Sequence, residues 1–287
     1  MSDKITKIYA YDGTVRIYGA TTTSLVEEAR TIHDTMPSAT VVFGQALSLG
    51  VIMGAMYKGE QALTIRVDGK GPLGGIMMTT NAHGQIRGYV GNPRVNFLTN
   101  DGKVNTSMAL GNEGFIHVTK DLKIRDIFTS SSEIVYGEIA SDFSYYFTKS
   151  EQIPSSCLTT VILDEYGRVS NACGFIIQAM PGCKKETLDR IEEIINSIDS
   201  LGALVQEGKS TFDILRILAD DNYEVLEEMP LSYYCNCSKE RYEKGLLTLG
   251  KEELENMVLE EKDGIEITCH FCGKQYHFTN DELKKLL

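Results

Sequence analysis

The stretch between Asp34 and Lys58 constrains the fold more than any other part of this chain, because its 23 residues carry no charged side chain. Most of its members are apolar, and Gly50 and Gly54 have the GxxxG spacing of membrane helices that dimerise. Against a membrane span, the stretch contains Pro37 and several polar side chains, and neither end has a basic cluster or an aromatic belt. We therefore predict a buried core helix and no membrane association.

The residues around this helix read as a mixture of strands and helices. A hairpin is predicted around Asp12-Gly13, and a helix over 22–34, where Ser24 and Glu27 have the spacing of a capping box. Further strands are predicted at 62–67, 85–90, 103–109, 115–118, 134–139, 158–163 and 173–180. Because strands outnumber helices and few βαβ alternations occur, the predicted class is α+β, with a mixed or antiparallel sheet and packed helices.

Composition and charge divide the chain into three parts. The 287 residues are 42% hydrophobic and 24% charged, as in ordinary globular proteins. Residues 184–231 hold 5 basic and 12 acidic side chains, and their apolar residues recur at helical spacing. We predict an α+β core domain over 1–183, an acidic helical linker over 184–231 that packs on it, and a small C-terminal domain over 232–287.

The overall charge and the N-terminus restrict partners and location. A formal net charge of -12 repels phosphate backbones, so nonspecific nucleic-acid binding is disfavoured. The first residues lack the apolar core of a signal peptide, which predicts a cytoplasmic protein. Its seven cysteines should then be reduced, and clustered cysteines indicate metal or redox chemistry.

Several catalytic motifs are missing from the sequence, which argues against an enzyme. The glycines of residues 69–74 match GxGxxG, but a β-like segment follows them and no acidic residue occurs from Gly69 to Asn100, so a dinucleotide site is not expected. Close backbone approach in a loop is the expected use of these glycines. The isolated histidines His33, His83 and His117 are read as packed or surface residues. Three further cysteines are read as buried small side chains: Cys157, Cys173 and Cys183.

Two cysteine pairs carry the chemistry. Cys235 and Cys237 are separated by 31 residues from a second pair, Cys269 and Cys272. Four thiolates are the ligand set of a tetrahedral Zn²⁺ site, and both sulfurs of a CxC in an extended segment face the same side. An iron–sulfur cluster, a metal-free dithiol, and His270 or His277 as substitute ligands remain alternatives.

The segment that holds these pairs is too small to have a large core. Its 56 residues contain few apolar side chains, and a piece of this size usually needs a staple. Structural zinc supplies about 10–16 kcal/mol of apparent binding energy, which the unfolded chain largely lacks. Loss of the metal is therefore predicted to unfold the segment. Because thiolates are what oxidants attack, the site can couple oxidation to unfolding.

A redox switch is one of three functions that fit a cysteine cluster of this kind. The other two are a zinc-ribbon nucleic-acid binder and a CxxC thiol oxidoreductase. The 232–287 segment has 8 basic and 11 acidic residues and no basic stripe, which disfavours nucleic-acid binding. A CxxC redox enzyme usually has its pair at a helix start, whereas strands are predicted before and after Cys269 and Cys272.

The sequence resembles the family of redox-regulated heat-shock chaperones of 33 kilodaltons over essentially its whole length. The likeness rests on CNC at 235–237 and CHFC at 269–272, on GPLGG at 71–75, on SEQIPS at 150–155 after YYF, and on QAMPG at 178–182. One departure is Cys173, where the family's strand is expected to have glycine.

This resemblance implies an ATP-independent holdase that binds unfolding proteins and prevents their aggregation under oxidative and heat stress. It implies that the reduced protein is largely inactive and binds one Zn²⁺ through four ligands: Cys235, Cys237, Cys269 and Cys272. Oxidation would form Cys235–Cys237 and Cys269–Cys272 disulfides, release zinc and loosen the C-terminal segment and the linker. The active form would be a homodimer.

Overall fold

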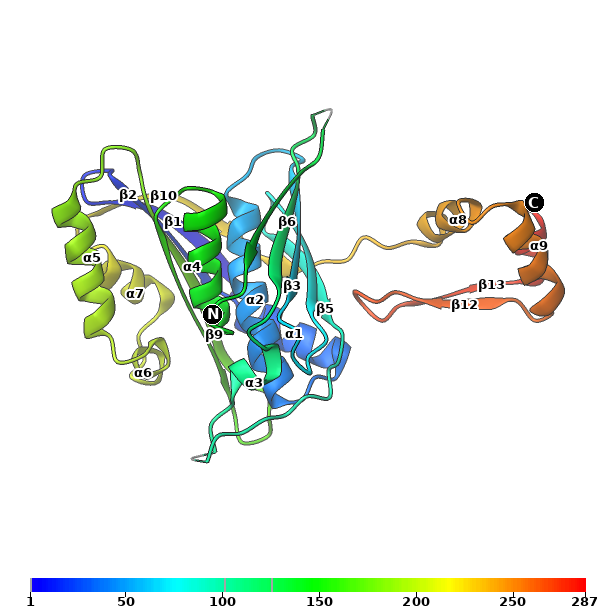
Figure 1. The fold of residues 1–287 in the computed structure, drawn as a ribbon, viewed down its shortest axis with the longest axis horizontal. Coiled ribbons are helices and arrows are strands. Elements are labelled where there is room, and N and C mark those ends of the chain that lie inside the picture. The colour runs from blue at the N-terminus through cyan, green and yellow to red at the C-terminus, as the bar shows by residue number, and fades with distance from the viewer. Residues whose placement is uncertain (1, 101, 125) are drawn as a thin grey trace. The chain divides into compact units, whose positions relative to one another are not determined.

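The uncharged stretch forms a long helix, α2 (Pro37–Ala55), which lies between two β-sheets (Figure 1). Of the helices in residues 2–100, 102–124 and 126–287, which the computed structural model describes, α2 alone is long and apolar enough to cross a membrane, and 94% of its apolar window is buried inside the fold. A Cβ on Gly54 would lie 2.2 Å from Oγ1 of Thr80. The GxxxG glycines therefore serve close helix–strand packing, and the predicted core helix is confirmed.

Two units make up the chain, Met1–Tyr233 and Tyr234–Leu287. In the first unit, a five-stranded sheet has the order β10-β1-β2-β9-β8, with every neighbour antiparallel. Its strands are β1 (Lys4–Ala10), β2 (Val15–Thr21), β8 (Ser155–Leu163), β9 (Val169–Ala179) and β10 (Tyr223–Pro230).

A second sheet of six strands has the order β11-β5-β4-β3-β6-β7, and only the short β11 runs parallel to its neighbour among the described strands. Its strands are β3 (Ala62–Asp68), β4 (Ile76–Asn81), β5 (Gln85–Val90), β6 (Phe115–Asp121), β7 (Phe128–Glu133) and β11 (Ser232–Tyr233). The class is α+β, as predicted.

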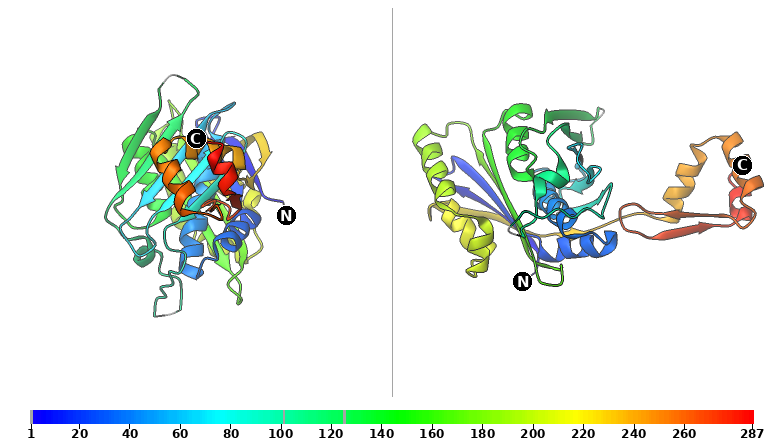
Figure 2. Two further views of the ribbon diagram at one scale, coloured as in Figure 1. Left: turned by 90° about the vertical axis from the view of Figure 1, so that its right-hand side faces the viewer. Right: turned by 60° about the horizontal axis from the view of Figure 1, so that its bottom comes forward.

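Helices cover both faces of the five-stranded sheet (Figures 1 and 2). On the inner face lies the main core around α2, with α1 (Thr23–His33) and α4 (Ile139–Ser150). On the outer face, α5 (Lys185–Ser197), α6 (Leu201–Gln206) and α7 (Thr211–Leu218) bury a second cluster. Because residues 172–177 of β9 are buried on both faces, they read as a continuous apolar run.

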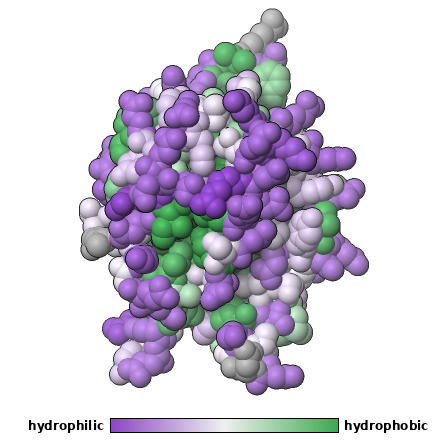
Figure 3. Space-filling model, turned by 90° about the vertical axis from the view of Figure 1, so that its left-hand side faces the viewer, coloured by the Kyte–Doolittle hydropathy of each residue, from purple (hydrophilic) through white to green (hydrophobic). Residues whose placement is uncertain are grey.

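The second cluster joins the predicted acidic segment to the sheet through apolar side chains. It is formed by Ile8, Val15, Ile17, Phe175 and Ile177 from the sheet and by Ile191, Ile194, Leu201, Ile214, Leu215 and Leu218 from the helices. Figure 3 shows this side of the molecule, where hydrophilic side chains surround a central apolar patch. The helical spacing of apolar residues in 184–231 is confirmed by α5 and α7, whereas β10 within the same segment was not predicted.

Two predicted strands are wrong, and local hydrogen bonds explain both. Residues 103–109 were expected to be a strand, but the Asn105 side chain accepts a hydrogen bond from the Met108 amide and begins helix α3 (Thr106–Leu110). Residues 134–139 were also expected to be a strand. There the Asp142 carboxylate accepts bonds from three backbone amides and makes a turn before α4: Val135, Tyr136 and Glu138.

The predicted capping box of Ser24 and Glu27 is also wrong. Helix α1 has Thr22 as its N-cap, without a side-chain cap bond. Instead the Asp3 carboxylate accepts from the Leu25 amide at 2.7 Å. The carboxylate of Glu27 accepts from Arg30 and from the Val169 amide. Asp3, which is distant in sequence, therefore caps the start of α1 in place of the local capping box that was predicted.

The second unit contains few elements and a small core. It consists of α8 (Lys239–Leu247), α9 (Lys251–Glu260), the β12–β13 hairpin (Ile265–Thr268 and Gln275–Phe278) and α10 (Asn280–Lys284). Its buried apolar cluster has only four members, with partly buried side chains around them: Leu246, Leu254, Phe278 and Leu283. The small core agrees with the sequence argument that this part needs additional stabilisation.

Candidate metal centre

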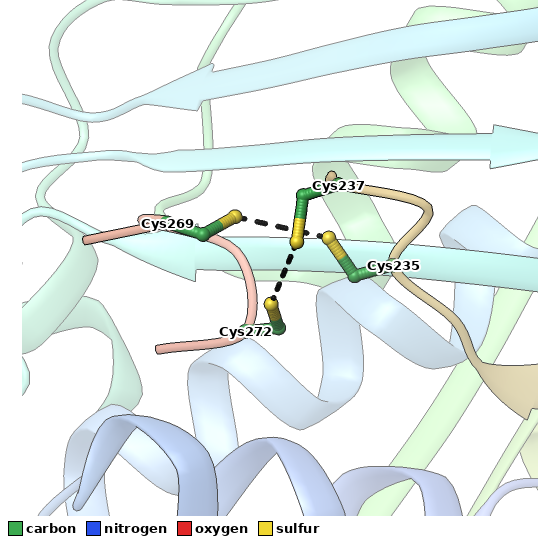
Figure 4. Close-up of side chains that lie close together, drawn as sticks. All are labelled: Cys235, Cys237, Cys269 and Cys272. Atoms are coloured by element: carbon green, nitrogen blue, oxygen red, sulfur yellow. Dashed lines mark hydrogen bonds between the residues drawn. The ribbon is translucent and has the colours of Figure 1, made fainter. Parts of the chain in front are cut away.

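The four cysteines of the two predicted pairs converge in the second unit (Figure 4). Their sulfur atoms all lie within 4.8 Å of one another. The Sγ atoms of Cys235 and Cys269 are 3.8 Å apart, and those of Cys237 and Cys272 are 3.3 Å apart. Cys269 is buried and the other three are half-buried. The close sulfur contacts therefore join one pair to the other.

The CxxC pair lies in the turn of the β12–β13 hairpin. The Cys269 amide donates to the Lys274 carbonyl oxygen, and the Gly273 amide donates to the Cys269 carbonyl oxygen, both at 2.8 Å. Gly273 has a φ of +70°, a conformation that favours glycine. This turn directs both sulfurs to one point. The predicted strands on either side are confirmed, and the pair does not start a helix.

The CxC pair lies in the loop before α8, and an arginine of that helix holds the loop. Ser238 is the N-cap of α8, and the Arg241 guanidinium donates to both the carbonyl oxygen and the side-chain oxygen of Asn236, at 3.2 and 2.7 Å. Asn236 separates Cys235 from Cys237. Arg241 therefore fixes the spacing of the two sulfurs, a role that the sequence analysis did not identify.

Two tyrosines border the sulfurs. The Tyr276 hydroxyl, from β13, donates to the carbonyl oxygen of Cys237 at 3.0 Å and to its sulfur at 3.1 Å. The ring of Tyr242, from α8, packs against that of Tyr276 with centroids 5.1 Å apart. These aromatic rings support the ligand loop and were also missed from the sequence.

The thiols differ in how readily they ionise. Burial disfavours the Cys269 thiolate, but hydrogen bonds from the Tyr242 hydroxyl and from nearby backbone amides outweigh it and lower the pKa of Cys269 to about 6. Burial raises the pKa of Cys272 to about 12, and its hydrogen bonds with the other sulfurs act in the same direction. The surroundings thus favour the thiolate form of Cys269 and disfavour that of Cys272. All four sulfurs can be deprotonated together only when a bound cation balances their negative charge.

The geometry of the sulfurs fits a tetrahedral Zn²⁺ ion. A zinc–sulfur distance of about 2.3 Å places the sulfurs of a Cys₄ site roughly 3.8 Å apart, close to the separations of 3.8 and 3.3 Å given above. The four residues could therefore hold a metal ion, and soft thiolates favour zinc or an iron–sulfur cluster over hard cations such as Mg²⁺.

The other cysteines and histidines considered in the sequence analysis lie outside this cluster. His270 and His277 are exposed and are not among the grouped ligand atoms of the described residues. Cys157 and Cys173 are buried as expected, and burial raises the pKa of each thiol to about 12. Cys183 is half-buried.

The glycines of residues 69–74 also have the role expected of them. A Cβ on Gly69 would lie 2.3 Å from the Leu110 carbonyl oxygen, so the loop approaches another backbone segment closely. The strand β4 (Ile76–Asn81) follows this loop, where a dinucleotide site would need a helix.

Comparison with known proteins gives one consistent family. The sequence model of the Hsp33 protein family matches residues 3–279. The chain is 44% identical to the 33 kDa chaperonin of Geobacillus sp. (strain WCH70) over 289 residues, which cover 100% of this chain and 97% of that protein. It is 42% identical to the 33 kDa chaperonin of Bacillus subtilis (strain 168) over 286 residues, covering 99% and 98% of the two chains.

A solved structure has the same fold over the full length. The crystal structure of the 33 kDa chaperonin (heat shock protein 33 homolog) of Thermotoga maritima matches with a TM-score of 0.91 and 32% identity, covering 100% of this chain and 98% of that one. Sequence and fold agree with the cysteine cluster, and the chain belongs to the Hsp33 family of chaperones.

Proposed function

We propose that this chain is a redox-switched, ATP-independent holdase that binds unfolding proteins and prevents their aggregation in the cytoplasm. The observation that carries this proposal is the convergence of four thiols in a unit whose buried apolar cluster has only four side chains. An oxidant-sensitive site thus coincides with the least stabilised part of the chain. No nucleotide, nucleic acid, membrane or catalytic step is part of the proposal.

In the reduced protein, Cys235, Cys237, Cys269 and Cys272 hold one Zn²⁺ ion as thiolates. The bound ion supplies the positive charge that lets all four sulfurs ionise, and it ties the CxC loop to the hairpin turn. Arg241 and Tyr276 orient the ligand loop through the hydrogen bonds described above. This state keeps the second unit folded and the protein largely inactive.

Oxidation converts the ligands into disulfides. We assign the pairs Cys235–Cys237 and Cys269–Cys272, following the family resemblance. Each pair of thiolates loses two electrons to one molecule of peroxide, which takes up two protons from the solvent and becomes two molecules of water. The sulfurs no longer act as thiolate ligands, and the chain gives up its zinc. Because the contacts of 3.8 and 3.3 Å given above join Cys235 to Cys269 and Cys237 to Cys272, disulfide mapping tests the assigned pairing directly.

The second unit then loses its staple, and the segment 184–231 loosens. The chain runs without interruption from α5–α7 through β10 and β11 to Cys235. When α5–α7 leave the sheet, the outer face of the five-stranded sheet is uncovered, including Ile17 and Phe175, which are fully buried in the closed form. Apolar surface of this kind binds unfolding proteins. The active form is a homodimer, as the family resemblance implies.

One titration tests the proposal. The reduced, zinc-loaded chain is treated with peroxide, and zinc release, amide exchange of residues 234–287 and light scattering of a denatured client are followed on the same sample. We expect the three signals to change together. Cys269→Ser should abolish the joint transition, whereas Cys157→Ser, at a buried thiol outside the cluster, should leave it intact. Equal client protection before and after oxidation would contradict the switch.

A further inference from the structure

Strand β10 covers an edge of the five-stranded sheet that would otherwise be open. It pairs only with β1 among the described strands, in a register that aligns Lys4 with Pro230 and Ala10 with Tyr223. The outer side of β10 is itself protected against pairing by three glutamates and a proline: Glu224, Glu227, Glu228 and Pro230. The edge of β1 beneath it has no proline and no acidic side chain, and its charged residues are Lys4 and Lys7.

The attachment of β10 depends on backbone pairing and charge more than on buried apolar surface. Most of its residues are exposed, with Val225 at 44% and Leu226 at 38%, and Met229 packs against the main core. The register also shifts between Lys7 and Ile8 of β1, which marks an irregular ladder. A strand held in this way separates from its neighbour more readily than one buried on both faces.

The charges of the two strands are complementary on both faces of the sheet. On one face, the Lys4 Nζ donates to the Glu228 carboxylate at 2.7 Å, and the Thr6 hydroxyl donates to the same oxygen at 3.1 Å. On the other face, Lys7 lies opposite Glu227 in the register. The edge of β1 is therefore a row of backbone groups flanked by lysines, matched to an extended strand that carries carboxylates.

We propose that β10 is a removable cover, and that the uncovered β1 edge binds an extended, carboxylate-bearing segment of an unfolding protein by strand addition. This inference rests on the proposed function, since the cover lies within the segment that oxidation loosens. Hydrogen bonds between main chains do not depend on the side chains of the bound segment. Strand addition therefore suits clients of many sequences, and the lysines add a preference for acidic ones.

The probe for this site is a peptide with the sequence of β10 itself, YEVLEEMP, compared with a second peptide in which the three glutamates are replaced by lysine. Both are added to the oxidised full-length chain. Because the tethered β10 competes equally with both peptides in one protein, their affinity ratio is the informative quantity. We expect the acidic peptide to bind about tenfold more tightly, and to slow amide exchange across Lys4–Ala10.

Reversing the charge of the two β1 lysines distinguishes specific binding at the β1 edge from nonspecific adsorption of the peptides. Lys4→Glu with Lys7→Glu should reverse the preference, so that the lysine peptide binds more tightly. The matched control is Lys58→Glu with Lys70→Glu, two exposed lysines outside β1 and β10 that change the net charge equally; it should keep the wild-type preference. Equal affinities, an unchanged preference in the β1 variant, or peptide protection without any effect on β1 would overturn the inference.

Three further results are informative. Occupation of β1 by β10 from a second copy, seen as exchange protection that excludes the peptide, would also overturn it. Failure of the oxidised wild-type chain to suppress client aggregation would instead reject the proposed function, and the inference with it. Client protection that survives while the peptides ignore β1 would leave the proposed function standing and remove only the edge site.

Discussion

The hydroxyl of Tyr233 donates a 2.7 Å hydrogen bond to the Gly88 carbonyl oxygen and accepts one of 3.2 Å from the Gly88 amide. Strand β11 ends at Tyr233, and its backbone pairing with β5 stops there. Beyond that point the phenol hydroxyl makes the hydrogen bonds to β5. It satisfies both polar groups of Gly88, as a further strand residue would. The side chain is buried, and only Tyr234 separates it from Cys235.

We predict that Tyr233→Phe lowers the free energy of unfolding of the first unit by about 1–3 kcal/mol, because both bonds to Gly88 are lost in a buried setting. At 2–4 °C for each kcal/mol, the melting temperature should fall by roughly 2–12 °C. Calorimetry of the reduced protein measures this effect. Tyr234→Phe is the matched control, since Tyr234 is 49% exposed, and an equal loss in both variants would contradict the prediction.

Removal of zinc should unfold the second unit and leave the two sheets around α2 in the first unit folded. The four buried side chains of that unit cannot replace the apparent binding energy of about 10–16 kcal/mol that a structural zinc site supplies. Amide exchange with and without a chelator measures the outcome. We expect loss of protection in α9 and in the β12–β13 hairpin, with β9 unchanged. A hairpin that stays protected from exchange after the metal is removed would contradict the prediction that zinc keeps the second unit folded.

Arg241→Ala should weaken zinc binding about 10- to 100-fold, the usual effect of removing a group that orients metal ligands. The guanidinium bonds to Asn236 hold the CxC loop, and the substitution removes both. Competition with a chromophoric chelator gives the affinity. Lys244→Ala removes one positive charge from the same helix at an exposed position. A similar loss in that control would show that charge alone, and not the orientation of the loop, explains the effect.

Gly19 and Leu215 form a tight contact between β2 and α7. A Cβ on Gly19 would lie 2.9 Å from Leu215 Cγ, and Leu215 is fully buried. Gly19→Ala should push α7 away from the sheet, and Leu215→Ala should cost about 2–5 kcal/mol through the cavity that it leaves. In the double variant, the smaller alanine at 215 makes room for the methyl group at 19. The double variant should therefore lose less unfolding free energy than the two single variants together, with a coupling energy of about 0.5–3 kcal/mol.

Urea unfolding measures this cycle, and client light scattering gives a second reading. Under the proposed function, each single variant should give the reduced protein part of the client protection that we expect oxidation to bring. Leu188→Ala on α5, at a side chain that is 38% exposed, should give neither effect. Additive costs in the double variant would show that the two residues do not share one contact.

Glu151 should make stability depend on pH. Burial disfavours its charge, but hydrogen bonds from Lys120, Tyr146 and Ser130 outweigh burial and hold the pKa of Glu151 below its ordinary value. Its stabilisation is therefore present above the unfolded-state pKa of about 4.3 and is lost as the pH falls through the lower folded-state value.

Glu151→Gln should accordingly destabilise the protein by about 1–3 kcal/mol at neutral pH, with the difference from wild type shrinking below about pH 4. Urea unfolding at a series of pH values measures this. Glu165→Gln, at an exposed turn position, should have no such effect. A difference for Glu151→Gln that stays constant down to pH 3 would contradict the assigned ion pair.

The sequence predicted α2 and the cysteine cluster because each leaves a pattern that tertiary structure does not alter. A helix buried on every side can carry no charge, and Cys235, Cys237, Cys269 and Cys272 retain their spacing in any fold. The strands around Asp12-Gly13 and at 85–90 were recoverable for a similar reason, since turn residues and alternation are local.

The errors occurred where a distant or competing polar group decides the structure. Asn105 and Asp142 each override a β-like run by accepting backbone hydrogen bonds. Strand β10 was missed because its glutamates hide the alternation, and its pairing with β1 joins residues more than two hundred positions apart. The support that Arg241 and Tyr276 give to the thiols depends on side-chain positions that no spacing rule supplies.

The crowding around α2 sets an order of events when the chain is heated. Gly54 and Gly44 bring the helix so close to its neighbours that an added Cβ would meet atoms 2.2 and 2.5 Å away. Such packing tolerates little expansion, so the first unit yields last, whereas the second unit relies on four sulfurs. We therefore expect the tightly packed interior of the first unit to persist at temperatures at which the second unit, with its four buried apolar side chains, has already unfolded.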